Sequence, residues 1–218
     1  MAGYNLRTIR SNHIKLEAKK RAEADFPTKF GHFRILGFEG TRRDPETGRP
    51  EAAVVLVMGD IYSEAPLVRI HSQCLTGDVF HSLRCDCRQQ LELALQLIAN
   101  AGAGILLYEQ KEGRGIGLIA KLQAYELQDQ GLDTVEANEK LGFKADHREF
   151  DLPAAVLHVM GVDEVRLISN NPQKVAALES AGIQVVERVP CEPLVGERSA
   201  AYLKTKKEKL GHLLGRED

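Results

Sequence analysis

Hydrophobic and polar positions follow different patterns in the two halves of the chain. In the first half, short apolar runs rich in β-branched residues occupy residues 29–38, 52–61 and 67–71. Runs of this length and composition are typical of β-strands. The segment D-P-E-T-G-R-P, which is rich in turn formers, separates the first two runs. Because the connections are short, we expect neighbouring strands in this half to be antiparallel.

In the second half, helical periodicity alternates with short apolar runs. Helices are predicted at residues 91–102, 116–131 and 170–182, and strands at 104–109, 164–169 and 184–189. Gly102 and Gly131 end the first two helices, and an Asn-Pro pair begins the third. A strand–helix–strand order implies parallel strands joined by a right-handed crossover. The sequence therefore predicts a single α/β domain with a mixed β-sheet, antiparallel in the N-terminal half and built of βαβ units in the C-terminal half, flanked by helices.

The two ends of the chain differ from this pattern. Residues 1–25 form a polar, basic extension, in which Ser11 is placed to cap a solvated surface helix over residues 14–24. The folded domain is then expected to occupy residues 26–218. From Ser199 onward, a lysine-rich tail predicts an amphipathic helix packed on the body.

Charge and composition exclude several classes of protein. The 218 residues carry a formal net charge of −2 and include no tryptophan, whereas nucleic-acid-binding domains are usually basic. No apolar run approaches the ~20 residues that span a bilayer, and the first residues lack the apolar core of a signal peptide. We therefore expect a cytoplasmic protein in a reducing compartment, with neither a membrane nor a nucleic acid as partner.

Three of the four cysteines gather in one run, R-I-H-S-Q-C-L-T-G-D-V-F-H-S-L-R-C-D-C. Cys85 and Cys87 project to one side of an extended segment, and the T-G-D turn lets Cys74 fold back towards them. Three thiolates bind zinc and leave the fourth position open for water, as catalytic zinc sites do. Zinc lowers the pKa of bound water towards ~7. Because thiolates donate more charge than imidazoles, we expect a less acidic water that needs a nearby base.

Other readings of the cysteines remain open. A redox dithiol usually has Cys-x-x-Cys spacing, which is missing here, and nothing indicates an oxidising compartment for a disulfide. Ordinary buried cysteines are common, but the flanking Arg84, Asp86 and Arg88 argue against a core position. Cys191, far away in the sequence, could be a fourth ligand and would make the zinc site structural.

Two segments have the composition of anion-binding loops. E-Q-K-E-G-R-G-I-G connects a predicted strand to a helix, and its glycines let backbone N–H groups approach a phosphate. Arg114 adds a forked donor, but Leu118 breaks the dinucleotide fingerprint, so a simple tight turn is the alternative. S-N-N-P-Q-K also joins a strand to a helix and fits either an anion site or plain helix capping.

Charged residues near the cysteines and in a later segment could serve a zinc site. Zinc with three thiolates carries a net charge of −1, which Arg69, Arg84 and Arg88 would offset while attracting a polyphosphate. In K-A-D-H-R-E-F, Asp146 next to Arg148 is either an ordinary solvated ion pair or the missing base.

Together these motifs resemble those of GTP cyclohydrolase II, the zinc enzyme that opens the imidazole ring of GTP at the start of riboflavin biosynthesis. The resemblance runs from about residue 25 to the C-terminus, and E-G-R-G-I-G-L, A-Y-E-L-Q-D-Q-G-L-D-T-V-E-A-N and S-N-N-P-Q-K carry it with the cysteine run. It implies a stand-alone enzyme without a dihydroxybutanone-phosphate synthase domain. It also implies a homodimer, magnesium with the GTP phosphates, and the products formate, pyrophosphate and a diaminopyrimidinone ribose phosphate.

The resemblance also implies roles for individual residues. Cys74, Cys85 and Cys87 would hold the zinc ion. Asp146 matches the proton acceptor, Tyr125 the tyrosine of ring opening, and Arg148 a nucleophile towards the α-phosphate. Contacts with GTP are implied for Arg69, Ile70, His71, Ser72, Gln73, Gln90, Glu112, Gly113, Arg114, Thr134, Ser169 and Lys174. A guanidinium stays protonated at neutral pH, so a phosphate clamp is an equal reading of Arg148.

The chain departs from the family pattern at five positions. His81 and Arg88 stand where glycine is expected, Lys111 where glutamine is expected, and Ala120 where asparagine is expected. Ser169 replaces a threonine and keeps the hydroxyl group. None of these changes removes a ligand or the expected base.

Two rival functions belong to other classes. A zinc nucleobase deaminase has His-x-Glu followed by Pro-Cys-x-x-Cys, and here the second cysteine of that motif is a leucine. A catalytically inactive, zinc-stabilised module that binds a nucleotide for regulation is the second alternative. The intact thiols, Tyr125 and Asp146 count against it.

Overall fold

The computed structural model describes residues 16–43, 48–143, 148–193, 207, 211–213 and 215. The strands are β1 (Ala18–Thr28), β2 (Gly31–Arg43), β3 (Pro50–Met58), β4 (Leu67–Ser72), β5 (Gly104–Glu109), β6 (Glu164–Ile168) and β7 (Gln184–Val189). The helices are α1 (Cys87–Ala101), α2 (Leu118–Asp129), α3 (Thr134–Lys140), α4 (Asp151–Val159) and α5 (Pro172–Ser180). Short helical turns, η1 (Leu75–Val79) and η2 (Glu112–Gly115), follow β4 and β5.

The seven strands form one mixed sheet in the order β1-β2-β3-β5-β4-β6-β7. The pairs β1–β2, β2–β3 and β3–β5 are antiparallel, whereas the pairs β5–β4, β4–β6 and β6–β7 are parallel. The predicted mixed α/β architecture is therefore confirmed. The expectation that residues 67–71 would lie antiparallel to the preceding strand is wrong, because β4 lies between β5 and β6. All five of these residues are buried, as is typical of a central parallel strand.

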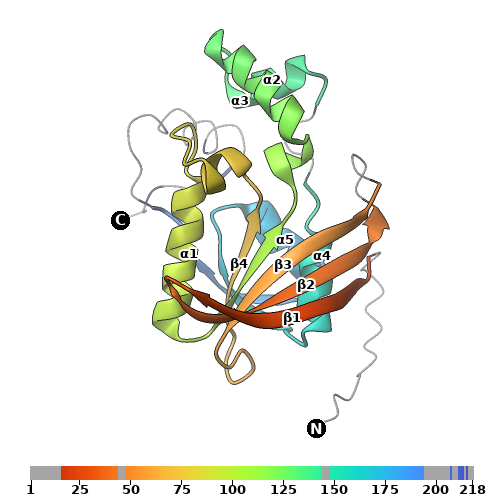
Figure 1. Cartoon of the computed structure of the whole chain (residues 1–218), viewed down its shortest axis with the longest axis vertical. Helices are drawn as coiled ribbons and strands as arrows, with labels where there is room; N and C mark the ends of the chain where they lie inside the picture. The colour runs from red at the N-terminus through yellow and green to blue at the C-terminus, as the bar shows by residue number, and fades with distance from the viewer. Residues whose placement is uncertain are drawn as a thin grey trace.

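Helices cover both faces of the sheet, with α1 on one side and α4 on the other (Figure 1). Neighbouring residues of β5 serve two cores, because successive side chains in a strand point to opposite faces. Ile105 and Leu107 pack in the core that includes α4, and Leu106 packs in the core that includes α1. The three side chains are at most 1% exposed, so β5 anchors both layers.

Residues 18–28 form a strand, so the helix expected over residues 14–24 is wrong from Ala18 onward, while its expected cap, Ser11, lies outside the described residues. β1 pairs with β2 along its whole length, from Ala18 opposite Gly40 to Thr28 opposite Gly31. Its lysines, alanines and glutamates favour a helix locally, but the ladder with β2 satisfies the backbone groups and overrides that preference. Cross-strand ion pairs such as Arg21–Glu39, 2.6 Å apart, occupy the exposed face.

Local signals correctly mark the end of α1 and the start of α5. Gly102 ends α1 in the left-handed conformation, with φ of 72°, and Asn171 caps α5 by accepting the Gln173 N–H at 2.9 Å. The sequence did not predict α3 and α4, although Asp133 and Glu136 form a capping box at the start of α3. The lysine-rich helix expected from Ser199 falls almost entirely outside the described residues.

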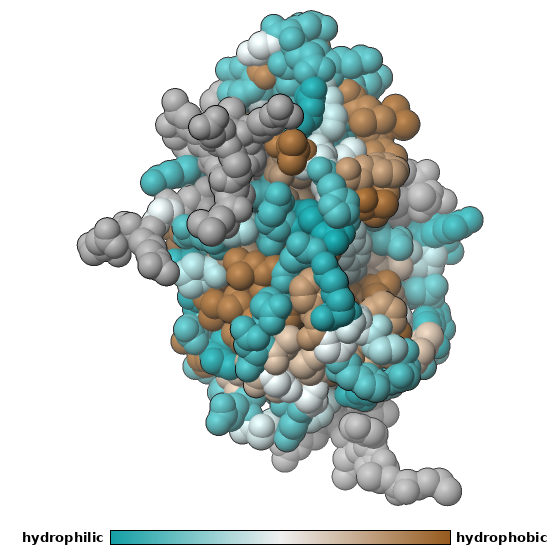
Figure 2. All heavy atoms as spheres, turned by 60° about the vertical axis from the view of Figure 1, so that its left-hand side comes forward, coloured by the Kyte–Doolittle hydropathy of each residue, from teal (hydrophilic) through white to brown (hydrophobic). Residues whose placement is uncertain are grey.

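The surface mixes charged and apolar side chains. On the face shown in Figure 2, polar side chains separate several apolar patches. Among the described residues, the two most exposed large apolar side chains are Phe80, after η1, and Ile119, at the start of α2. Within the described part of the chain, none of the helices has the length and apolar character needed to cross a bilayer.

Candidate active site

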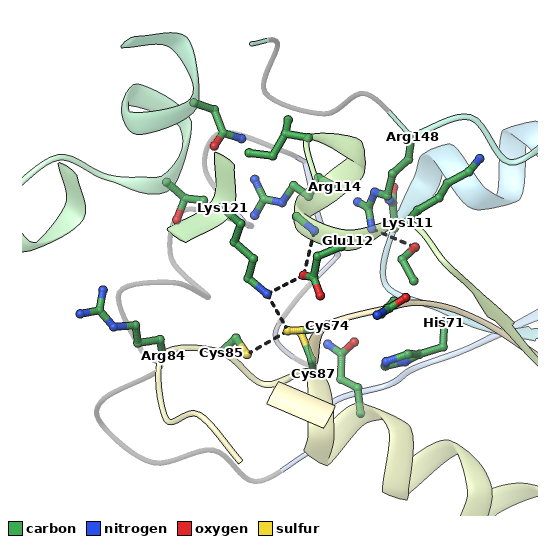
Figure 3. A pocket seen from close by; sticks show the side chains of 18 of the residues that line it. His71, Cys74, Arg84, Cys85, Cys87, Lys111, Glu112, Arg114, Lys121 and Arg148 are labelled. Atoms are coloured by element: carbon green, nitrogen blue, oxygen red, sulfur yellow. Dashed lines mark hydrogen bonds and ion pairs between the residues drawn. The ribbon is translucent and has the colours of Figure 1, made fainter. Parts of the chain in front are cut away.

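A pocket opens where three neighbouring parallel strands end. The carboxyl ends of β4, β5 and β6 lie at one edge of the sheet, which is where open α/β sheets usually bind ligands. The loops that follow these strands contribute residues to the pocket, and α2 and α3 add another wall (Figure 3). Of the residues implied by the family resemblance, the pocket is lined by Arg69, His71, Ser72, Gln73, Cys74, Cys85, Cys87, Gln90, Glu112, Gly113, Arg114, Tyr125, Thr134, Arg148, Ser169 and Lys174.

Two of the implied residues are not in this lining. Ile70 is fully buried in the core, and only its carbonyl oxygen faces the site, where it accepts a hydrogen bond from Lys174 Nζ at 2.7 Å. Asp146 lies outside the described residues. The side chain of Ile70 therefore supports the sheet and has no surface to offer a ligand.

The three thiols of Cys74, Cys85 and Cys87 form a group that fits a metal ion. Their sulfur atoms all lie within 4.8 Å of one another, and the sulfurs of Cys74 and Cys85 are 3.7 Å apart. Thiolates bound tetrahedrally at ~2.3 Å from zinc would lie about 3.8 Å apart, so this spacing suits zinc. Gly77 makes room for the group, because an added Cβ would lie 2.9 Å from the Cys85 sulfur.

The loop that carries Cys74 is held by a buried carboxylate. Asp78 Oδ2 accepts hydrogen bonds from the Cys74 N–H at 3.0 Å and from the Tyr108 hydroxyl at 2.8 Å. His71 Nε2 lies 3.2 Å from Asp78 Oδ1. Burial lowers the pKa of His71 despite this carboxylate, so the imidazole is neutral at pH 7. Asp78 thus fixes the loop of residues 73–87, called the metal-binding loop below because its three thiols could hold an ion, against β4 and β5.

Cys191 is not a fourth ligand. Its side chain is 1% exposed, packs in the core next to α1, and directs its sulfur to the Gln90 carbonyl oxygen at 3.7 Å. Among the described residues, the group that could hold a metal consists of the other three cysteines. Cys191 therefore does not close the fourth coordination position of a bound ion. A catalytic zinc site needs that position for water.

The charge next to the sulfurs comes from an unexpected residue. The arginines expected to offset the thiolates donate elsewhere: Arg69 to Gln90 (2.7 Å), Arg84 to Asp129 (2.5 Å) and Arg88 to the Asp78 carbonyl oxygen (2.6 Å). Instead, Lys121 Nζ of α2 donates to the Cys74 sulfur at 3.2 Å. Hydrogen bonds from Cys85 and Cys87, with the nearby Lys121 ammonium, lower the pKa of Cys74 despite its burial.

Lys121 itself is largely buried. Burial alone lowers the pKa of this lysine, but the Cys74 thiolate and the Glu112 carboxylate outweigh it and raise the pKa, so the side chain stays cationic. The only signal for Lys121 in the sequence is its position, one helical turn before Tyr125 on the same helix.

Tyr125 faces the metal-binding loop. Its hydroxyl lies 3.1 Å from Thr76 Oγ1, and the guanidinium of Arg84 lies 4.8 Å from the ring centroid. Burial raises the pKa of Tyr125, so the phenol remains protonated at neutral pH and can donate a hydrogen bond. The structure therefore brings the tyrosine and the three thiols to the same end of the pocket.

The glycine-rich loop, residues 109–117, is held in an uncommon backbone conformation. Gly113 and Arg114 both have positive φ, 59° and 63°, and a non-glycine residue in this region stores strain that often marks a functional site. The Glu112 carboxylate supports the loop, since it accepts the Leu75 N–H at 2.6 Å and the Gly113 N–H at 2.9 Å. Glu112 thereby joins the glycine-rich loop to the metal-binding loop.

Cationic side chains gather at the other end of the pocket. Lys111, Arg148 and Lys174 line it, and Arg148 Nη1 donates to Ser72 Oγ at 3.4 Å. Beneath them lies Glu109, a fully buried carboxylate whose pKa is raised by burial. One end of the pocket therefore carries thiols and the other carries positive charge.

Comparison with known proteins identifies the family. The family model described as GTP cyclohydrolase II matches residues 19–190. The GTP cyclohydrolase-2 of Escherichia fergusonii is 54% identical over 202 residues, which cover 92% of this chain and 99% of that protein. The GTP cyclohydrolase-2 of Proteus mirabilis is 53% identical over 202 residues, with 91% and 98% covered.

Among solved structures, a two-domain 3,4-dihydroxy-2-butanone 4-phosphate synthase from A. baumannii is similar, with a TM-score of 0.48 and 18% identity. The match covers 81% of this chain and 41% of that one. The sequence relatives are far more similar and are matched over nearly their whole length. The chain belongs to the GTP cyclohydrolase II family of enzymes.

Proposed function

We propose that this chain opens the imidazole ring of GTP and releases formate and pyrophosphate, leaving 2,5-diamino-6-ribosylamino-4(3H)-pyrimidinone 5′-phosphate for riboflavin biosynthesis. One observation carries the proposal: a pocket has three clustered thiols at one end and the cations Lys111, Arg148 and Lys174, grouped around Glu109, at the other. A purine base next to the thiols and a triphosphate among the cations would use both ends. The names of the relatives agree with this substrate.

Cys74, Cys85 and Cys87 would hold one zinc ion per chain. Zinc would supply Lewis acidity and activate water at neutral pH for opening the ring and for hydrolysis of the resulting formamide. The protonated hydroxyl of Tyr125, oriented by Thr76, would donate a hydrogen bond or a proton to the base as the ring opens. Asp146 would accept a proton, as the family pattern implies.

At the phosphate end, release of pyrophosphate depends on positioning and charge neutralisation. Arg148 would act as a clamp on the phosphoryl group, since its guanidinium stays protonated and already donates to Ser72 in the wall of the pocket. Magnesium would accompany the phosphates. Further contacts with GTP are proposed for Arg69, Ile70 through its backbone, His71, Ser72, Gln73, Gln90, Glu112, Gly113, Arg114, Thr134, Ser169 and Lys174.

The proposal extends to the whole protein. We expect a cytoplasmic homodimer without a nucleic-acid partner, in which residues 26–218 form the catalytic domain and residues 1–25 a basic extension. Exposed apolar side chains such as Phe80 and Ile119 offer surface for contact between subunits. Part of β1 lies before residue 26 and pairs with β2, so the end of the extension contributes to the sheet.

The test measures formate and pyrophosphate side by side after zinc-loaded protein is incubated with GTP and magnesium, with ultraviolet absorbance reporting the pyrimidinone. Cys85→Ser should abolish formate release, because it removes one thiolate ligand. Cys191→Ser is the matched control, since it changes a buried cysteine outside the metal group and should keep the release. Binding of GTP without any product would instead indicate a regulatory module, and release of ammonia would indicate a deaminase.

A further inference from the structure

We propose that Lys121 is a positioning residue of the thiolate site: its ammonium binds the Cys74 sulfur and the Glu112 carboxylate together and so holds the metal-binding loop against the glycine-rich loop. This inference rests on the proposed function, because it concerns the same site. None of the sequence motifs assigned a role to this lysine.

The contacts of Lys121 are short and enclosed. Nζ lies 2.6 Å from Glu112 Oε1 and 3.2 Å from the Cys74 sulfur (Figure 3). The side chain is 12% exposed and that of Glu112 is 9% exposed, and lysine is rarely buried to this degree unless it is paired. An ammonium group has three donors, so one lysine can serve both acceptors at once.

These contacts connect three separate segments of the pocket. Lys121 comes from α2, Cys74 follows β4, and Glu112 follows β5. Glu112 also accepts the N–H of Leu75, the residue directly after Cys74. The glycine-rich loop packs on the stem of the lysine, since an added Cβ at Gly113 would lie 3.1 Å from Lys121 Cβ. Loss of the lysine would therefore loosen the relative placement of all three segments.

The charge of Lys121 has a second effect. A divalent ion with three thiolates carries a net charge of −1, and the ammonium of Lys121, which also pairs with Glu112, would partly offset the charge at the Cys74 sulfur. Hydrogen bonds to metal ligands reduce the charge that those ligands donate, and they orient the ligands. Lys121 would thus counteract the strong donation by three thiolates, which otherwise makes the ion a weaker Lewis acid.

The experiment compares Lys121→Met with Lys140→Met. Both variants remove one positive charge, but Lys140 is exposed at the end of α3, whereas Lys121 contacts the sulfur. Zinc affinity is measured by competition with a chromophoric chelator, and the protein loaded with Co²⁺ is examined for its sulfur-to-cobalt charge-transfer absorption. Neither measurement requires turnover of GTP.

Lys121→Met should weaken zinc binding about 10- to 100-fold, the usual effect of removing a partner of a metal ligand. Its charge-transfer band should move to longer wavelength, because a sulfur without a hydrogen bond gives up its electrons more easily. Lys140→Met should match the unaltered protein in both measurements. If Lys121→Met does not fold, Lys121→Leu, which also has no donor, replaces it with the same expected result.

Equal zinc affinities and identical cobalt spectra for the Lys121 and Lys140 variants would overturn the role of Lys121. The proposed reaction fails by a different result, namely zinc-loaded unaltered protein that releases no formate from GTP. The two proposals are therefore tested independently.

Discussion

The substitution Gly77→Ala tests the geometry of the thiol group directly. A Cβ at residue 77 would lie 2.9 Å from the Cys85 sulfur, 3.1 Å from the Cys74 sulfur and 3.1 Å from Cys87 Cβ. The φ angle of Gly77 is not positive, so alanine adds no backbone strain of the left-handed kind. The perturbation is therefore steric, and its three nearest contacts are with the three cysteines.

The expected size of the effect follows from these contacts. Forcing an extra methyl group into a well-packed site costs about 1–3 kcal/mol. If that strain falls on the metal-bound arrangement, zinc affinity decreases about 5- to 150-fold, since 1.4 kcal/mol corresponds to a factor of about ten. Gly37→Ala is the matched control, because a Cβ there would meet only Ala22 Cβ, at an ordinary 3.9 Å.

Zinc affinity is measured by chelator competition for both alanine variants, and thermal unfolding of the metal-free proteins checks that each one folds. If the two variants bind zinc equally tightly, the cysteines do not surround residue 77 in the metal-bound protein. That result would refute the assignment of the open metal site to this loop.

Two further predictions concern other parts of the pocket. Tyr125→Phe should slow formate release more than pyrophosphate release, because its hydroxyl lies at the thiol end, and equal losses in an assay of both products would contradict its role in ring opening. Glu109→Gln should stabilise the fold increasingly as pH rises. Burial raises the pKa of Glu109 in the folded protein above its pKa in the unfolded chain. The stability that protonated Glu109 contributes is therefore complete below the unfolded pKa and is lost as pH rises through the folded pKa, whereas glutamine stays neutral. Urea unfolding of the variant and the unaltered protein at pH 5 and pH 8 gives the difference between their free energies of unfolding. If the advantage of the variant is smaller at pH 8 than at pH 5, the raised pKa of Glu109 is contradicted.

Elements with local signals could be predicted from the sequence. Gly102 and the Asn171-Pro172 pair mark helix ends through backbone geometry that only nearby residues determine. By contrast, β1 depends on pairing with β2, and its composition favours a helix. The parallel placement of β4 depends on β5 and β6, which lie far along the chain. Such long-range pairing leaves no local pattern.

In the candidate site, too, some residues could be predicted from the sequence and others could not. The spacing of Cys74, Cys85 and Cys87 predicted a metal-binding group, and the structure brings their sulfurs together. Lys121 and Asp78 were missed, because a lysine on a helix and an aspartate in a turn are usually solvated. Their importance follows from burial and from the sulfur and backbone partners that the fold brings to them.

The three thiols that could hold a metal ion all lie between residues 74 and 87, whereas the rest of the pocket draws on segments from residue 69 to residue 212. A bound species stabilises a protein only to the extent that it prefers the native state to the denatured chain. Since a denatured chain can still wrap three neighbouring cysteines around an ion, zinc should add less to resistance against unfolding than its native affinity suggests. A nucleotide has no comparable binding site in the denatured chain, so it should be the more effective protector against heat and proteolysis.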